Sequence, residues 1–370
     1  MATTTDLINA VHDEIVRVLG DVDGASLVQM GWPGISLGPA DFRRTDDPQG
    51  PVDADVAGET VAALANIVPV FSKVRFENSG RTVDEIYETL LTGAVSDPLD
   101  ERFTAAREAL LQARRACHDD PQRFYHPCTA SPGDWYDEAA TAGWTAVQLS
   151  SSDMQPASVA SSPFMAAGGL ELARTSAWRL KPIVADNAIL RHKLQHAVAG
   201  TLGRGGLDIA GVDLLRPNLG IATLAKRLAV KNLVDRHTPM LPSSPGTNGF
   251  SISFRMRRVT IDRPWLALEL LGADDWWMPG TPGGAYSTGA VASNPGAFAA
   301  LTTAFVVIRD LKISANWAAD DRKHLGNAST FACFDLRSGT VKHAAVEVKG
   351  LQVIAWLARV MPRLPPRSPP

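Results

Sequence analysis

The stretch Phe250-Ser251-Ile252-Ser253-Phe254-Arg255-Met256 decides the fold of the second half of the chain. Large apolar residues alternate with polar ones, which places the two kinds on opposite faces of an extended backbone. This alternation is typical of a half-buried antiparallel strand. Val259 and Ile261 continue the pattern after a shift of one position at Arg257-Arg258, and the shift predicts a β-bulge.

Further β-strands are expected downstream of this stretch. Phe305–Ile308 together with Leu311–Ser314 reads as a second strand, and Thr330–Leu336 reads as a third. After a turn at Ser338-Gly339, Val341–Val348 is expected to return against the third strand as a hairpin. We therefore expect residues 250–360 to form an antiparallel, β-sandwich-like domain.

The first half of the chain is predicted to be helical with long loops. Apolar residues from Leu7 to Leu19 recur at helical spacing, and Gly20 is placed to end that helix. Thr82 and Glu85 form a capping-box pattern for a second helix that Gly93 ends. The Ala- and Glu-rich run over residues 100–116 predicts a third helix, while residues 32–51 are predicted to be a proline- and glycine-rich loop.

The expected fold class is therefore α+β, with a helical, loop-rich N-terminal region followed by the β-sandwich-like domain. The mixed segment is expected to hold strands at Trp144–Leu149 and Thr175–Leu180 and helices near 187–202 and 221–236. The predicted parts are an acidic helical region (1–143), a mixed α/β segment (144–238), a Pro/Gly-rich linker (239–249), a β-rich domain (250–360) and a Pro-rich tail (361–370).

Charge is distributed unevenly along the chain. The 370 residues carry 36 basic and 39 acidic side chains, a net charge of −3, which argues against a dedicated nucleic-acid-binding protein. Residues 1–150 hold 11 basic and 24 acidic side chains, whereas residues 151–370 hold 25 and 15. Opposite charges of this size favour association, either within one chain or between chains.

The opening residues and the cysteines indicate the cellular compartment in which the protein is expected. The opening residues lack the basic and apolar regions of a secretory signal, so we expect a cytoplasmic protein, with export by another route left open. The three cysteines, Cys117, Cys128 and Cys333, are too few for a disulfide framework or a four-cysteine zinc site.

Two patterns resemble ligand sites but lack a required part. His192 and His196 lie four residues apart, as in a zinc protease, but Lys193 stands where the general-base glutamate would be. The glycine-rich run Gly200–Gly206 follows a predicted helix instead of opening one, so its amides are misplaced for phosphate. No catalytic residue, metal site or cofactor is assigned from the sequence.

An enzyme remains an alternative if loops bring side chains together. The candidates are His126, Cys128, Asp134 and Trp135, which combine an imidazole, a thiol and a carboxylate within ten positions. Adjacency in sequence does not by itself place Cys and His in contact or form a thiolate.

Aromatic residues beside prolines and glycines indicate an interaction surface instead. Trp276 and Trp277 are consecutive, so in an extended segment their rings point to opposite sides. Tryptophan is enriched at binding hot spots because it buries a large area at small entropic cost. The predicted interaction residues are Trp265, Trp276, Trp277, Tyr286, Phe298, Arg363 and Arg367.

Residues 276–308 contain no charged side chain, and Pro295-Gly296 interrupts the run. An uncharged, small-residue loop can lie on another subunit without burying an unpaired charge. The same stretch could alternatively insert into a bilayer as a hairpin. A loop buried within its own chain is the third interpretation.

The leading hypothesis is a non-enzymatic interaction or self-assembling structural protein whose partner is itself, with acidic and basic halves in contact. A membrane-active, pore-forming-like protein is the first alternative, although the sequence shows no spanning segment. An enzyme with a site near His126 is the second.

Overall fold

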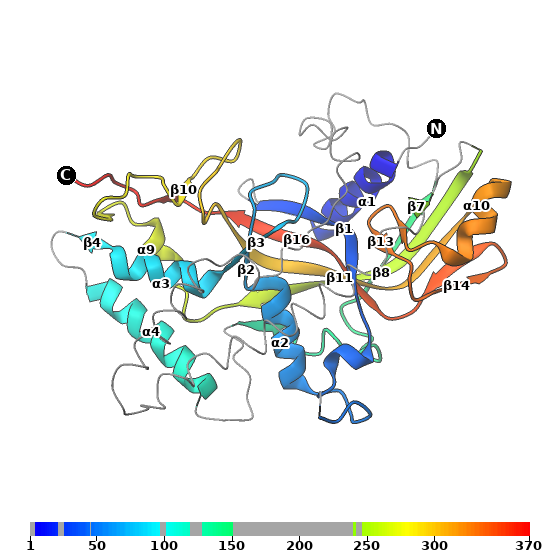
Figure 1. Cartoon of the computed structure of the whole chain (residues 1–370), viewed down its shortest axis with the longest axis horizontal. Coiled ribbons are helices and arrows are strands. Elements are labelled where there is room, and N and C mark those ends of the chain that lie inside the picture. The colour runs from blue at the N-terminus through cyan, green and yellow to red at the C-terminus, as the bar shows by residue number, and fades with distance from the viewer. Residues whose placement is uncertain are drawn as a thin grey trace, which may run out of the picture.

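The computed structural model describes residues 4–20, 26–44, 46–96, 101–118, 128–150, 240–241 and 246–370, and its elements are arranged as in Figure 1. Within these ranges it holds six α-helices and a large antiparallel sheet of eight strands, which confirms the mixed α+β class. The helices are α1 (Thr4–Leu19), α2 (Ala54–Ala65), α3 (Val83–Gly93), α4 (Glu101–His118), α9 (Leu268–Gly272) and α10 (Ala319–His324).

The large sheet is organised around one long strand, β11. One edge of β11 pairs with β16 and then β15, and its other edge pairs with β8. Strand β1 pairs with β16, β14 pairs with β15, and β5 and β6 pair with β8. The eight strands are β1 (Ser26–Leu37), β5 (Thr129–Ser131), β6 (Thr145–Ser150), β8 (Asn248–Asp262), β11 (Ala300–Asn316), β14 (Gly339–Lys342), β15 (Ala345–Val348) and β16 (Leu351–Val360).

Both faces of the sheet are covered near its centre. Along β11, Ala304, Val306 and Ile308 belong to a first core cluster that includes α1. The intervening Phe305 and Val307 belong to a second cluster that includes α2. Successive side chains of a strand point to opposite faces, so α1 and α2 lie on opposite sides of the sheet (Figure 1).

A third core cluster lies at one end of the strands. It joins α3, α4 and α9 to residues near the ends of β8 and β16, and it includes Trp265, Trp276 and Leu364. The small sheets are β2 (Ile67–Pro69) with β3 (Asn78–Thr82), β4 (Val95–Ser96) with β9 (Trp276–Trp277), β10 (Ser287–Thr288) with β17 (Arg363–Leu364), and β13 (Phe334–Asp335) with β12 (Thr330–Phe331) and β7 (Met240–Leu241). The short 3₁₀ helices are η1 (Pro39–Phe42) and η4 (Leu325–Asn327).

The shift at Arg257-Arg258 has a different cause from the predicted bulge. Strand β8 is continuous, and both arginines pair in regular register with β11. Residues up to Met256 are buried in the first cluster, whereas Val259 and Ile261 are buried in the second. The apolar pattern therefore changes phase because the buried face changes, while the strand continues.

Two further predictions about strands were wrong. The predicted loop after Trp32 begins as strand β1, whose register on β16 shifts between Met30 and Ile35, where the glycines and proline fall. Residues 330–336 form the short strands β12 and β13, with Ala332 at a positive φ of 51° between them, and β14 pairs with β15 instead.

The expected β-sandwich-like arrangement stays a prediction. Phe331 and Phe334 of the three-stranded sheet pack on Phe250 and Phe254 of β8, with ring centroids 5.5 and 5.8 Å apart. The division of the chain at 239–249 stays a prediction, although β1 and β5 of the first region lie in the same sheet as β16 and β8.

Candidate functional site

The uncharged loop, defined here as residues 279–297, connects β9 to β11. Two buried polar side chains fix it from inside: Asn294 donates from Nδ2 to Ser287 Oγ over 2.9 Å, and Ser287 Oγ donates to Met361 O over 2.8 Å. The backbone N of Thr288 donates to Asn294 Oδ1 over 2.9 Å. These bonds hold residues 287–294 in one conformation.

The tip of the uncharged loop faces outward. Residues 288–293 are exposed, and Val291 keeps 39% of its surface accessible. A surface without charged groups avoids the desolvation penalty that burying a charge carries. A loop held in one conformation also loses less entropy on binding than a free one.

The Pro-rich segment, residues 361–370, folds back against this loop. Its strand β17 pairs with β10, so that Ser287 opposes Leu364 and Thr288 opposes Arg363. Tyr286 N donates to Leu364 O over 2.7 Å, and Leu364 has no exposed surface. The segment is therefore docked on its own chain and is not a free extended tail.

The predicted interaction residues fall in and around this region. Trp265, Trp276 and Phe298 are buried in the third core cluster, whereas Trp277 and Tyr286 are partly buried. Strand β9, which carries the two consecutive tryptophans, pairs with β4, the short strand between α3 and α4 in the chain. The three buried rings stabilise the core, and a role in contacts with a partner stays a prediction.

The two arginines of the Pro-rich segment are exposed. Arg363 donates from Nη2 to Gly283 O over 3.3 Å, so its guanidinium lies on the uncharged loop. A role of Arg363 and Arg367 in contacts with a partner stays a prediction.

The residues of the enzyme alternative do not form an activated site in the described part of the chain. His126 lies outside that part. Cys128 is buried, and its burial raises the thiol pKa to about 11 despite the opposing charge of Arg263. Asp134 pairs with Arg257 over 2.9 Å, and Trp135 packs edge-on against Phe305 in the second cluster. The thiol is thus held protonated, the opposite of what a nucleophile needs.

Other sequence candidates are placed as follows. His192, His196 and the run Gly200–Gly206 lie outside the described residues, as do the helices and the strand predicted between 175 and 236. Burial raises the pKa of Cys333 to about 12. Among the residues that the structure describes, no three His, Cys, Asp or Glu side chains are grouped to hold a metal ion.

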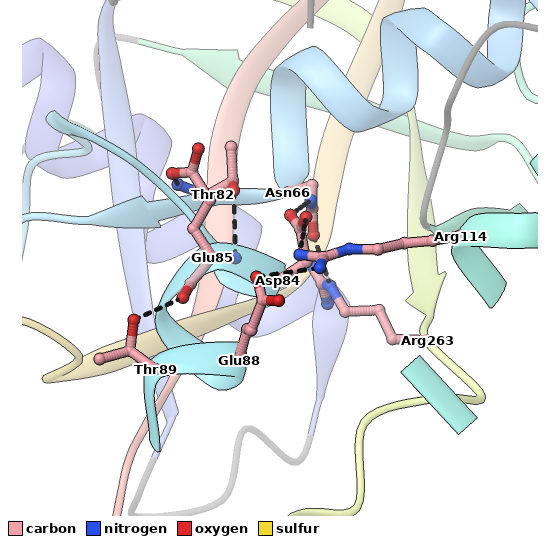
Figure 2. Close-up of polar contacts among 8 residues, drawn as sticks. All are labelled: Asn66, Thr82, Asp84, Glu85, Glu88, Thr89, Arg114 and Arg263. Carbon is pink, nitrogen blue, oxygen red and sulfur yellow. Dashed lines mark hydrogen bonds and ion pairs between the residues drawn. The ribbon is translucent and has the colours of Figure 1, made fainter. Parts of the chain in front are cut away.

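A buried polar cluster joins four distant segments (Figure 2). Asn66, at the end of α2, accepts from Arg263 Nε over 3.3 Å and donates to Asp84 Oδ1 over 2.8 Å. Asp84, in the first turn of α3, pairs through Oδ2 with Arg114 of α4 over 3.3 Å. Arg114 in turn pairs with Glu88 over 2.9 Å. From the interior to the surface, the charged members Arg263, Asp84, Arg114 and Glu88 alternate in sign, and the neutral Asn66 lies between the first two.

Arg263 is the innermost member of this cluster. It donates from Nη1 to Thr302 O over 2.8 Å and from Nη2 to Ala65 O over 2.7 Å, so its hydrogen-bond acceptors are neutral oxygens. Burial lowers its pKa, and electrostatic interactions with Cys128, Asp84 and Asp262 act in the opposite direction. Asp84 is buried and is one of the groups that offset this cation, and Asn66 bonds to both side chains.

Sequence reasoning missed this cluster and the anchors of the uncharged loop. Asn66 and Arg263 are 197 positions apart, and no short pattern connects them. For the loop, no signal in the sequence separates Ser287 and Asn294 from Thr281, Thr288 and Ser293, which are polar residues of the same stretch.

Comparison of the chain with family models, curated proteins and solved structures finds no match. Within the described residues, no helix combines the length and the apolar character needed to cross a bilayer.

Proposed function

We propose that this protein is a non-enzymatic, self-assembling protein that contacts other copies of itself through the uncharged loop and through surfaces of opposite charge. The observation that carries the proposal is the loop itself. It is exposed at residues 288–293, lacks charge and is fixed by the buried pair Ser287–Asn294. These are the properties of a surface that binds protein at low entropic and desolvation cost.

Charge supports the second part of the proposal. Burial, followed by the charges of Asp137, Asp53 and Asp134, raises the pKa of Tyr136, so several carboxylates gather around this ring. Exposed cations occur in the other region, among them Arg258, Arg359 and Arg363. In the part of the chain that the structure describes, the ion pairs Arg257–Asp134 and Arg102–Asp275 join the two regions. Exposed carboxylates and exposed cations favour pairing between copies.

The chemistry of the buried groups agrees with a non-enzymatic role. Cys128 and Cys333 are held as neutral thiols by burial. The membrane alternative gains no support from the second half of the uncharged stretch, because Ala300–Ile308 forms the buried first half of β11.

The test is static light scattering of the purified chain over a range of concentrations. At an ionic strength of about 0.01 M, where screening is weak, the mass is expected to exceed that of one chain and to rise with concentration. At about 0.5 M salt the mass is expected to fall, because exposed charge pairs are screened. A mass of one chain at every concentration in low salt would overturn the proposal.

A pair of matched variants tests the loop. Val291→Lys places a charge on the loop tip and is expected to reduce association at least tenfold, by roughly the 1.4 kcal/mol that this factor represents. Val341→Lys is the control, since Val341 is also exposed, at 44%, but lies on β14 away from the loop in sequence. Equal association of the two variants would exclude the loop from the interface.

A further inference from the structure

The uncharged loop contains a binding site for an extended backbone. Gly284 N donates to Pro365 O over 2.8 Å and Tyr286 N donates to Leu364 O over 2.7 Å. Gly283 N donates to Ser368 Oγ over 3.0 Å. These bonds add the Pro-rich segment to the loop as an extra strand, the geometry used by proteins that bind peptides by strand addition.

This binding site requires a residue without a side chain at position 283. A Cβ on Gly283 would lie 2.9 Å from Arg367 C and 3.0 Å from Ser368 N, both of them backbone atoms. Gly283 does not have a positive φ, and the three nearest atoms that a Cβ there would meet all belong to the docked segment. A substitution at Gly283 therefore tests contact with the docked segment without adding backbone strain at a positive φ.

The docked segment has the features of a peptide ligand. Leu364 is fully buried in the third core cluster and anchors the segment. Pro362, Pro365 and Pro366 restrict the backbone before docking, which reduces the entropy lost on binding. The ligand class is thus an extended, proline-containing peptide with one buried leucine.

We propose that residues 283–289 are a strand-addition receptor for the Pro-rich segment of a second copy, which replaces the copy's own segment when the chains assemble. The inference rests on the proposed self-assembly and names its contact. An exchanged segment makes the same hydrogen bonds and buries the same leucine, so exchange costs only the entropy of association. Exposed Pro362 joins β16 to β17 and is the point at which the segment diverges.

Complementation between full-length chains tests the exchange. Leu364→Asp yields a chain with an intact receptor and a defective segment, and Gly283→Val yields the reverse. Each variant alone is expected to be monomeric at the concentration used, whereas an equimolar mixture is expected to form one-to-one heterodimers. Differently tagged chains and light scattering measure both quantities.

Controls separate docking from folding. Gly272→Val is the control for Gly283→Val, because no atom lies within 4 Å of a Cβ at Gly272. A mixture of Gly272→Val with Leu364→Asp is expected to form no more heterodimer than a mixture of wild type with Leu364→Asp. Circular dichroism of each variant establishes that it folds. Leu364→Ala is a milder segment variant should the aspartate disturb the core.

A titration reports on the receptor independently of assembly. A labelled peptide of residues 361–370 is added to the full-length Leu364→Asp chain, whose receptor is empty, and saturable binding is expected. A peptide with alanine for Leu364 is expected to bind at least about tenfold more weakly. Equal binding of both peptides, or no binding, overturns the receptor.

The two proposals fail in different ways. If wild-type chains associate but the complementary variants form no heterodimer, the exchange is wrong and self-assembly stands on another surface. If wild type is monomeric in low salt while the peptide binds saturably, self-assembly is wrong and the receptor holds only its own segment.

Discussion

Asn66 and Asp84 are joined by a 2.8 Å hydrogen bond that orients the amide so that its oxygen faces Arg263. The amide thus lies between a buried cation and a buried carboxylate, and it holds the end of α2 against the start of α3 (Figure 2). The charge of Asp84 is shared between Arg263 on the inner side and Arg114 on the outer side.

Removal of this charge is expected to destabilise the protein strongly. Asp84→Asn removes one of the charges that offset the buried Arg263, and it weakens the contacts of Asp84 with Asn66 and Arg114. Hydrogen bonds to a charged group contribute about 1.5–3 kcal/mol, so a loss of that size in unfolding free energy is expected. Denaturant unfolding measures the loss. The control is Glu88→Gln, which breaks the outer pair with Arg114 where the carboxylate is 50% exposed, and which is expected to cost less than about 1 kcal/mol. Equal losses would show that Asp84 does not compensate Arg263.

The cap of α3 gives a prediction that could be made from sequence alone and that the structure supports in detail. Glu85 N donates to Thr82 Oγ1 over 3.4 Å, and Thr82 N donates to Glu85 Oε2 over 3.2 Å, which completes the capping box. Thr82→Ala is expected to cost about 0.5–2 kcal/mol, measured by thermal unfolding, while Thr82→Ser retains the bond and most of the stability. A serine variant as unstable as the alanine variant would contradict the role of the hydroxyl.

Predictions from the sequence were accurate where a pattern depends on residues close together in the chain. The capping box, the alternation from Phe250 to Met256 and the stop at Gly20 depend on neighbours in sequence, and the structure confirms all three. Strand β1 was missed because Pro33 and Gly34 signal a loop, whereas here they lie at a register shift where β1 passes close to β16. A Cβ at Gly34 would lie 2.8 Å from Val353 O, so glycine is required by the packing.

The candidate site was predictable only in outline. The absence of charge over residues 276–308 marks the uncharged loop in the sequence, but its anchors depend on contacts with residues far along the chain. Ser287 bonds to Met361, 74 positions away, and Arg263 bonds to Asn66 across 197. Only the fold brings such residues together, and no periodic pattern in the sequence predicts these contacts.

The adjacent residues Trp276 and Trp277 offer an internal comparison. Trp276 is fully buried and lies edge-on to Phe103 of α4, with ring centroids 5.7 Å apart, whereas Trp277 is only partly buried. Trp276→Ala is expected to cost about 3–5 kcal/mol of unfolding free energy because it leaves a cavity between α4 and β9. Trp277→Ala is expected to cost less than half as much. The midpoints of urea unfolding compare the two, and a larger loss at Trp277 would contradict the described packing.

The reactivity of Cys128 follows from its burial. With a thiol pKa of about 11, fewer than about one molecule in a hundred carries the thiolate at pH 8. Iodoacetamide is therefore expected to leave Cys128 unmodified in the native protein and to modify it once the chain is unfolded, as mass spectrometry of the peptides would show. Rapid native labelling at pH 8 would mean that the thiol is accessible and ionised.

The same pKa predicts how stability depends on pH. In the unfolded chain the thiol ionises near its ordinary pKa of about 8.5, whereas in the folded protein it keeps its proton until about pH 11. The contribution is complete below about pH 8.5 and is lost as the pH rises toward 11, by about 1.4 kcal/mol for each pH unit. Cys128→Ala removes this term, so the variant is expected to lose less stability than wild type between pH 8.5 and 11. Because other groups also titrate in this range, the measured quantity is the difference between the two chains, and parallel curves would contradict the raised pKa.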